Sequence, residues 1–321
     1  MAHTASPVPT PSNPIEHQGR TYQSYPGSNY VLPSDAAERE RYVPVISVAD
    51  TTLMTWTRLS LQHRLLKSVY ENRVILPPVN ISSEDCVLDS GTGSGTWLLD
   101  AIESFPASTT VDAVDIESRL WPVDDPRIIE RGNVNFHVGN VTSLPEDWTA
   151  RFKLVHQRLL VAALRSPEWT KALEEISRVL QPDGWVQLGE VGPWKAGPTT
   201  ARHLALFRAL FRDKDLDLDC ATHIPDVLRE VGFTDVTVEE RTMPIGSWAG
   251  QLGIDARDDL ISVFRGVKTP ILNAGGYGFV ASETEFEKLL DEVEREIDET
   301  PGAEAKFYII YARKPSVNVH A

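Results

Sequence analysis

The chain has 321 residues, of which 41% are hydrophobic and 24% charged, a balance that excludes disorder of the whole chain. The formal net charge is -15, and no run rich in Lys and Arg offsets it, which argues against nucleic acid as a partner. The two cysteines, Cys86 and Cys220, give no disulfide framework and no metal-ligand spacing, so we expect no metal and a reducing compartment. Without a secretory signal or a run of about eighteen apolar residues, we expect a cytoplasmic protein that does not enter membranes.

The N-terminal part divides into two segments. Residues 1–20 are rich in Pro, Ser and Thr and predict a disordered tail. Residues 21–80 predict a lid followed by helix: the lid holds tyrosines among Pro, Gly and Ser, and from Ser34 the pattern turns helical, with Asp35 as its cap. The residues that recur at helical spacing are Leu59, His63, Leu66 and Tyr70.

From Cys86 onward, short β-branched runs alternate with amphipathic helices, which is typical of parallel βαβ units. Residues 81–315 are therefore expected to form a doubly wound α/β domain, with residues 246–302 as a helical insertion over the active-site edge. Pro182, Asp183 and Gly184 predict a turn directly before the fifth strand. The predicted strands are Cys86–Asp89, Thr110–Asp115, Val134–Val138, Phe152–His156, Trp185–Gly189, Thr234–Glu239 and Phe307–Ala312.

The strongest functional signal is an apolar strand that ends at Asp89 and continues through alternate glycines at Gly91, Gly93 and Gly95. A nicotinamide fingerprint would need glycine at the position of Thr96, so that interpretation is weakened. Alternate glycines let the backbone pass close to a ligand, and amides at a helix start can meet a carboxylate, which suits an amino-acid moiety. Asp89 would face the ammonium of such a ligand, or would cap the following turn.

Two further polar residues follow the next strands. Asp115 ends the second strand, twenty residues after Gly95, where a carboxylate can accept both hydroxyls of a ribose; alternatively it is a solvated acid. Asn140 follows the third strand, where its amide oxygen can recognise the exocyclic amine of adenine. Together with the glycine loop, these positions predict an adenosyl ligand.

The sequence resembles the class I S-adenosylmethionine-dependent methyltransferases, and most closely the group found in fungal secondary metabolism. This resemblance spans roughly residues 22–315 and implies a seven-stranded, mostly parallel, Rossmann-like sheet with an antiparallel last strand. It also implies S-adenosyl-L-methionine as cofactor and methyl transfer to a small molecule. The segments that carry it are Tyr30–Pro33, Gln62–His63, the glycine loop with Trp97, Leu154–Arg158, Arg178–Trp185 and Met243–Gly246 before Trp248.

The resemblance also assigns the cofactor-binding residues. The family usually carries Asp where Asn140 stands and often Gly where Asp183 stands; the first departure changes an acceptor and the second affects only a turn. The residues expected to contact the cofactor are Asp89, Gly91, Thr92, Gly93, Gly95, Asp115, Ile116, Asn140, Val141, His156 and Gln157.

Methyl transfer is an in-line displacement in which alignment and exclusion of water supply much of the acceleration, so a dedicated base is not required. If a base is used, His156 at the end of the fourth strand is the first candidate and His63 the second; for each the alternative is a packing residue. The aromatic residues expected to wall an acceptor pocket are Tyr22, Tyr25, Tyr30, Trp194 and Trp248. Core packing explains the two tryptophans equally well, and a group of tyrosines such as this is more often a docking segment than a catalytic one.

The acceptor atom is left open by the sequence. We expect O-methylation of a small metabolite first, N- or S-methylation second, and as a different class a regulatory protein that binds cofactor but acts through protein partners. A homodimer or a protein partner stays open as well.

Overall fold

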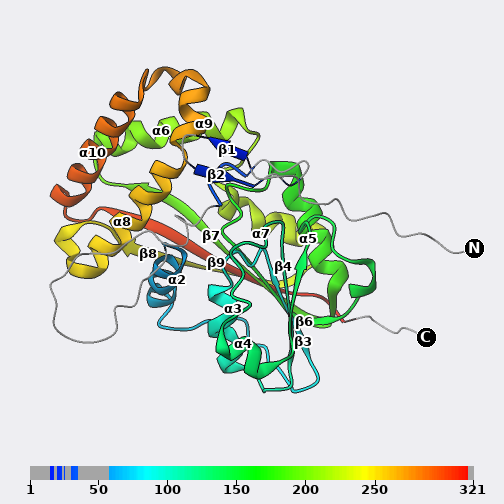
Figure 1. The fold of residues 1–321 in the computed structure, drawn as a ribbon. Helices are drawn as coiled ribbons and strands as arrows, with labels where there is room; N and C mark the ends of the chain where they lie inside the picture. The colour runs from blue at the N-terminus through cyan, green and yellow to red at the C-terminus, as the bar shows by residue number, and fades with distance from the viewer. Residues whose placement is uncertain (1–14, 18–19, 24, 26–29, 35–57, 317–321) are drawn as a thin grey trace, which may run out of the picture.

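The structure, a computed structural model, describes residues 15–17, 20–23, 25, 30–34 and 58–316 (Figure 1). A seven-stranded sheet in the order β5-β4-β3-β6-β7-β9-β8 runs through its centre. β9 is antiparallel to both β7 and β8, and the other neighbours are parallel, which confirms the predicted fold class. The strands are β3 (Cys86–Ser90), β4 (Thr110–Asp115), β5 (Val134–Val138), β6 (Phe152–Arg158), β7 (Leu180–Lys195), β8 (Thr234–Pro244) and β9 (Glu304–Arg313).

Successive side chains of β3 point to opposite faces of the sheet, so both faces carry apolar side chains. Helices cover both faces. Val87 packs with Trp97 of the predicted crossover helix, whereas Leu88 belongs to the larger cluster on the other face. That larger cluster also contains Trp169 and Leu228. The helices around the sheet are α3 (Thr96–Ala101), η1 (Ile102–Ser104), α4 (Pro126–Arg131), η2 (Glu146–Trp148), α5 (Ser166–Val179), α6 (Pro198–Asp213) and α7 (Cys220–Val231).

The predicted turn at residues 182–184 lies inside β7 and does not precede it. Pairing with β6 passes from Leu180 opposite Phe152 to Trp185 opposite Leu154, so the turn forms a bulge. The amide of Lys314 donates to the carbonyl of Gly184, which keeps the bulge within the sheet. Asp183 has a φ of 63°, a conformation that Gly adopts most readily and Asp tolerates. The strand boundary was wrong because turn chemistry does not reveal the pairing partner.

The N-terminal segment contains a short hairpin, in which β1 (Ile15–His17) pairs antiparallel with β2 (Arg20–Tyr22). The disordered tail was therefore expected to extend too far along the chain. Strands of three residues are too short to leave a periodic signal in the sequence. The helix expected after it is α2 (Arg58–Val69), which buries Leu61 and Leu65. The proposed cap Asp35 lies outside the described residues.

The segment between β8 and β9 is helical, as expected. In Figure 1 these helices gather at one end of the sheet beside α6, and α2 packs against α8. Among the described residues, no helix is both long and apolar enough to cross a bilayer. The elements are η3 (Ser247–Ala249), α8 (Gly250–Gly266), α9 (Lys268–Asn273), η4 (Gly275–Gly278) and α10 (Glu283–Glu299).

Candidate cofactor and acceptor site

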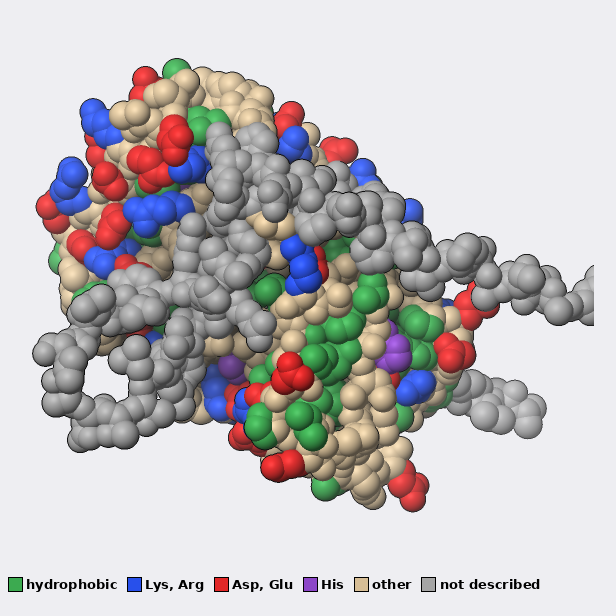
Figure 2. Space-filling view, in the orientation of Figure 1, with side chains coloured by type: hydrophobic (Ala, Val, Ile, Leu, Met, Phe, Trp, Pro, Cys, Tyr) green, Lys and Arg blue, Asp and Glu red, His purple; other side chains and the backbone are tan. Residues whose placement is uncertain are grey.

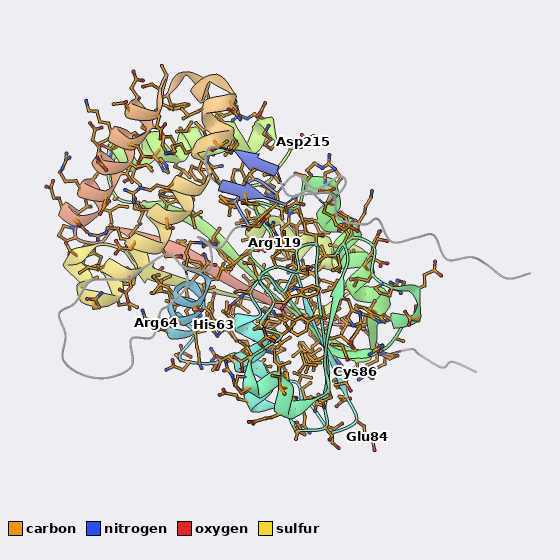
Figure 3. All side chains as sticks on the ribbon, viewed as in Figure 1. His63, Arg64, Glu84, Cys86, Arg119 and Asp215 are labelled. Atoms are coloured by element: carbon orange, nitrogen blue, oxygen red, sulfur yellow. The ribbon has the colours of Figure 1, made fainter. Side chains whose placement is uncertain are left out.

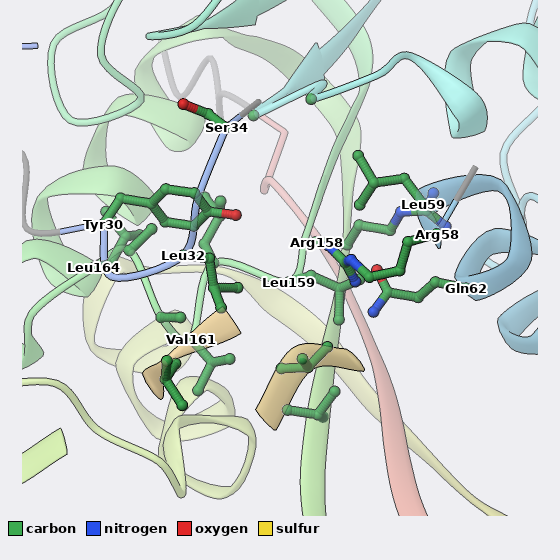
Figure 4. A pocket seen from close by; sticks show the side chains of 18 of the residues that line it. Tyr30, Leu32, Ser34, Arg58, Leu59, Gln62, Arg158, Leu159, Val161 and Leu164 are labelled. Atoms are coloured by element: carbon green, nitrogen blue, oxygen red, sulfur yellow. The ribbon is translucent and has the colours of Figure 1, made fainter. Parts of the chain in front are cut away.

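A cavity of about 270 Å³ lies where the carboxyl ends of β3, β4 and β6 meet α2 and α8. Its polar end is formed by the glycine loop and by the residues that follow β4 and β5. Its other end is formed mainly by apolar side chains of residues 159–164, α6 and α8. Figure 4 shows Arg58, Gln62 and Arg158 on one side of this space and Tyr30 on the other. This is the edge where open α/β sheets bind ligands.

The glycine loop turns tightly at the end of β3. The amides of Gly91 and Thr92 both donate to the carbonyl of Val114, at 2.8 and 3.0 Å, which ties the loop to β4. Gly91 and Gly93 have φ angles of 73° and 55°, a region that disfavours side chains. A Cβ atom built on Gly93 would meet nothing within 4 Å, so the space beside its backbone is open to a ligand.

Asp115 is held against the glycine loop by main-chain amides. Its Oδ2 accepts from the amide of Gly93 at 2.8 Å, and its Oδ1 from the amide of Glu117 at 2.9 Å. Burial raises the pKa of Asp115 to about 6, although these two amides lower it. Each carboxylate oxygen can accept a second hydrogen bond. Because Asp115 lines the cavity, two hydroxyls of a ligand could reach it there.

Asp89 stabilises the glycine loop through two hydrogen bonds. One of its oxygens accepts from the Thr92 hydroxyl at 2.6 Å, and the other from Nδ1 of His156 at 2.8 Å. Asp89 is buried and is not among the described residues that line the cavity, whereas Thr92 is. This geometry fits the alternative, in which Asp89 stabilises the turn.

His156, the first candidate base, is buried and packs against Trp97. Its ring stacks on the indole of Trp97, with 3.7 Å between ring centroids and 5° between planes. Burial lowers its pKa, so the ring is neutral and donates Nδ1–H to Asp89. Among the described residues, those that line the large cavity do not include His156. His156 therefore positions Asp89, and through it the loop.

His63, the second candidate base, lies on α2 (Figure 3) with both ring nitrogens engaged. Nε2 donates to Asp100 at 3.0 Å, and Nδ1 accepts from the guanidinium of Arg158 at 3.0 Å. Burial, followed by the charge of Arg158, lowers the pKa of His63 to about 4. A neutral imidazole with both nitrogens occupied is poorly placed to take a proton from an acceptor.

Arg158 is a cavity residue that the sequence analysis did not single out. A second guanidinium nitrogen donates to the Thr96 hydroxyl at 3.1 Å, beside the glycine loop. Burial lowers the pKa of Arg158 to about 10, so it stays cationic at neutral pH. A cation here can bind a carboxylate. Its position at the end of β6, next to a candidate site residue, was the signal available in the sequence.

Three residues that were expected to contact the cofactor, Asn140, Gln157 and Gly95, have other contacts in the structure. The side-chain oxygen of Asn140 accepts from the amide and hydroxyl of Thr142, at 3.0 and 2.9 Å, so it is not available to an adenine amine. Gln157 is buried, accepts a hydrogen bond from the Ser90 hydroxyl and is not among the described residues that line the cavity. Gly95 is not among the described residues that line the cavity, and a Cβ there would come within 2.8 Å of Pro122. The predicted residues that do line the cavity are Gly91, Thr92, Gly93, Asp115, Ile116, Asn140 and Val141.

The predicted aromatic wall is only partly assembled. Tyr30 and Trp194 line the cavity. Trp248 is 40% exposed, donates Nε1–H to the carbonyl of Ile245 and is not among the described residues that line the cavity. Tyr25 is half-buried and is also absent from the described lining, and the side chain of Tyr22 lies outside the described residues.

Comparison with known proteins identifies the family. Residues 87–184 match the family described as methyltransferase domain. The N-methyltransferase sirN of Leptosphaeria maculans is 29% identical over 91% of this chain and 97% of its own length. The chain is an S-adenosylmethionine-dependent methyltransferase.

Other relatives of the methyltransferase include the N-methyltransferase tcpN of Claviceps purpurea, 28% identical over 80% of this chain and 93% of that protein. The secondary metabolism regulator laeA of Coprinopsis cinerea is 27% identical over 72% of this chain and 56% of its own length. Among solved structures, the methyltransferase is similar to phosphoethanolamine N-methyltransferase 2 of Haemonchus contortus with S-adenosyl-L-methionine. That likeness has a TM-score of 0.49 at 16% identity and covers 82% of this chain and 59% of that chain. The cofactor of the methyltransferase is S-adenosyl-L-methionine, for which the open space beside Gly93 provides room.

Proposed function

We propose that this methyltransferase transfers a methyl group from S-adenosyl-L-methionine to a nitrogen atom of a small, largely apolar molecule in fungal secondary metabolism. The glycine loop makes room for the cofactor, Asp115 accepts hydrogen bonds from its ribose, and Arg158 pairs with its carboxylate. The cofactor supplies an electrophilic methyl on a sulfonium. The chain's residues hold that methyl toward the apolar half of the cavity and exclude water.

The single observation that carries the proposal is the composition of the cavity, which joins a polar, glycine-lined end to a hydrocarbon end. Trp194, Phe207 and Phe264 form an aromatic wall, with 5.4 Å between the Trp194 and Phe207 centroids and 5.0 Å between those of Trp194 and Phe264. Such a wall suits a small apolar acceptor and not a nucleic acid. On the face shown in Figure 2, basic side chains are interspersed with acidic ones and form no continuous basic surface among the described residues.

Nitrogen is favoured over oxygen for two reasons. Four relatives that match 80% or more of the chain are named N-methyltransferases. In addition, a neutral amine nitrogen attacks through its lone pair and loses its proton only afterwards, whereas a hydroxyl usually needs a base as it attacks, and both histidines expected for that purpose are engaged elsewhere. The first expectation, O-methylation, is therefore replaced by its alternative.

A transfer assay tests this proposal. The purified chain is incubated with S-adenosyl-L-methionine carrying a tritiated methyl and with matched pairs of small apolar compounds that differ only in bearing N–H or O–H. We expect labelled product from the N–H members alone. Transfer to the O–H members alone would overturn the choice of nitrogen. Cofactor binding without transfer to any compound would favour the second candidate, a regulatory protein, which the similarity to laeA suggests.

A further inference from the structure

A buried polar cluster interrupts the hydrocarbon wall of the cavity. It consists of Arg58 and Gln62 on α2 and Asp259 on α8, and all three line the cavity. The side chains of Arg58 and Asp259 are 6% and 10% exposed, and a guanidinium nitrogen lies 3.6 Å from Oδ1 of the carboxylate. The Gln62 amide donates to Oδ2 at 3.3 Å. Figure 4 shows Arg58 and Gln62 beside Arg158 and Leu159, which border the cofactor end.

Placing the Asp259 carboxylate in an apolar wall costs desolvation free energy. Leu260, Val263 and Phe264 of the same helix also line the cavity, so the carboxylate lies among hydrocarbon, opposite its partners on α2. A buried ion pair usually contributes little net stability, because desolvation offsets its attraction. An exposed pair between Arg64 and Asp255, at 2.7 Å, already joins the same two helices. Attachment of α2 to α8 therefore does not require a charge inside the cavity.

The other carboxylates among the described lining residues have different partners. Asp115 is held by the amides of the glycine loop and of Glu117. Glu117 itself pairs with the guanidinium of Arg119. Glu168 accepts from the amide and side chain of Arg165 at the start of α5. Asp259 is thus the cavity carboxylate placed among the apolar side chains that we assign to the acceptor.

We propose that Asp259 binds the N–H of the acceptor and receives its proton, an inference that rests on the proposed N-methyl transfer. The acceptor nitrogen forms a bond to the methyl carbon while the carbon–sulfur bond of the cofactor breaks, and its electron pair stays on sulfur. The proton from nitrogen passes to the Asp259 carboxylate, which becomes a neutral acid and later releases that proton to solvent. Arg58 and Gln62 hold the carboxylate in place during this exchange.

A matched pair of probes tests the binding step. Indole carries one N–H on a planar apolar ring suited to the aromatic wall, and 1-methylindole lacks that N–H. In the presence of S-adenosylhomocysteine, we expect the wild-type chain to bind indole about tenfold more tightly, the value of one hydrogen bond to a charged group. Equal affinities would overturn the proposal. Failure to bind S-adenosylhomocysteine would instead refute the proposed function.

Two double variants separate recognition from helix attachment. Arg58→Met with Asp259→Leu removes the buried pair without leaving a lone charge, and Arg64→Met with Asp255→Leu removes the exposed pair between the same helices. We expect the first to bind S-adenosylhomocysteine normally, to lose the preference for indole and to lose methyl transfer by about 100-fold or more. The second should resemble the wild type. Equal behaviour of the two variants would overturn the proposal.

A conservative single variant covers the case in which the buried double variant does not fold. Asp259→Asn keeps the shape and an oxygen that accepts the acceptor's N–H, but it cannot take the proton. We expect it to retain the preference for indole and to lower kcat while KM changes little. A kcat equal to that of the wild type would show that Asp259 is not the proton acceptor.

Discussion

Gly93→Val is expected to abolish binding of S-adenosylhomocysteine, with an affinity loss of about 100-fold or more, equivalent to about 2.7 kcal/mol. The new side chain would project from the glycine loop into space in which no described atom lies within 4 Å of a Cβ. That space is where we place the cofactor. The φ of 55° at Gly93 also strains a branched residue, at a cost of about 1–2 kcal/mol in the free energy of unfolding.

Gly132→Val is the matched control for strain. Gly132 follows α4 and has a φ of 68°, and a Cβ atom built on it would likewise meet nothing within 4 Å. Gly132 is not among the described residues that line the cavity. Both variants should lose similar stability in thermal unfolding, and only Gly93→Val should lose affinity in calorimetry. Equal affinity losses would show that strain, and not occupation of the cofactor's space, causes the effect.

His156→Ala is expected to lower the free energy of unfolding by about 3 kcal/mol. The change leaves the buried carboxylate of Asp89 without its imidazole donor and removes the ring stacked on Trp97. Because Asp89 also holds Thr92, the cofactor affinity should fall as the loop loosens. The methyl transfer that remains should keep the pH profile of the wild type, since His156 takes no proton from the acceptor.

Chemical denaturation, calorimetry and a pH series of transfer rates measure these three effects. His223→Ala is the control, because His223 is an exposed histidine that contacts Asp217 and should leave all three unchanged. The role that we assign to His156 would be refuted by a variant with wild-type stability and cofactor affinity whose transfer rate no longer depends on pH near neutrality.

The sequence was most informative where a short stretch determines its own structure. β4 and β5 have the predicted bounds because apolar and β-branched residues recur within each and a loop with polar residues follows. The glycine loop was located because alternate glycines allow a path that other residues resist. Asp115 was predicted to be near the loop because parallel strands end at the same edge, and the structure places it there.

Side-chain direction and partners were much harder to predict. His156 was known to end a strand, but only the packing of Trp97 against it shows that the ring points away from the cavity. Asn140 turns its oxygen to Thr142, a local hydrogen bond that competes with a ligand. Asp259 looks like an ordinary polar residue of an amphipathic helix until α2 is seen to cover it. Contacts between segments distant in sequence decided the cases of His156 and Asp259.

Calorimetric titration of the purified chain with S-adenosylhomocysteine tests most directly whether the glycine loop and Asp115 form a cofactor site. We expect one molecule bound per chain, and for Asp115→Ala an affinity lower by about 30-fold or more because two hydrogen bonds to a carboxylate are lost. Absence of heat with folded protein, or equal binding by Asp115→Ala, would contradict this assignment.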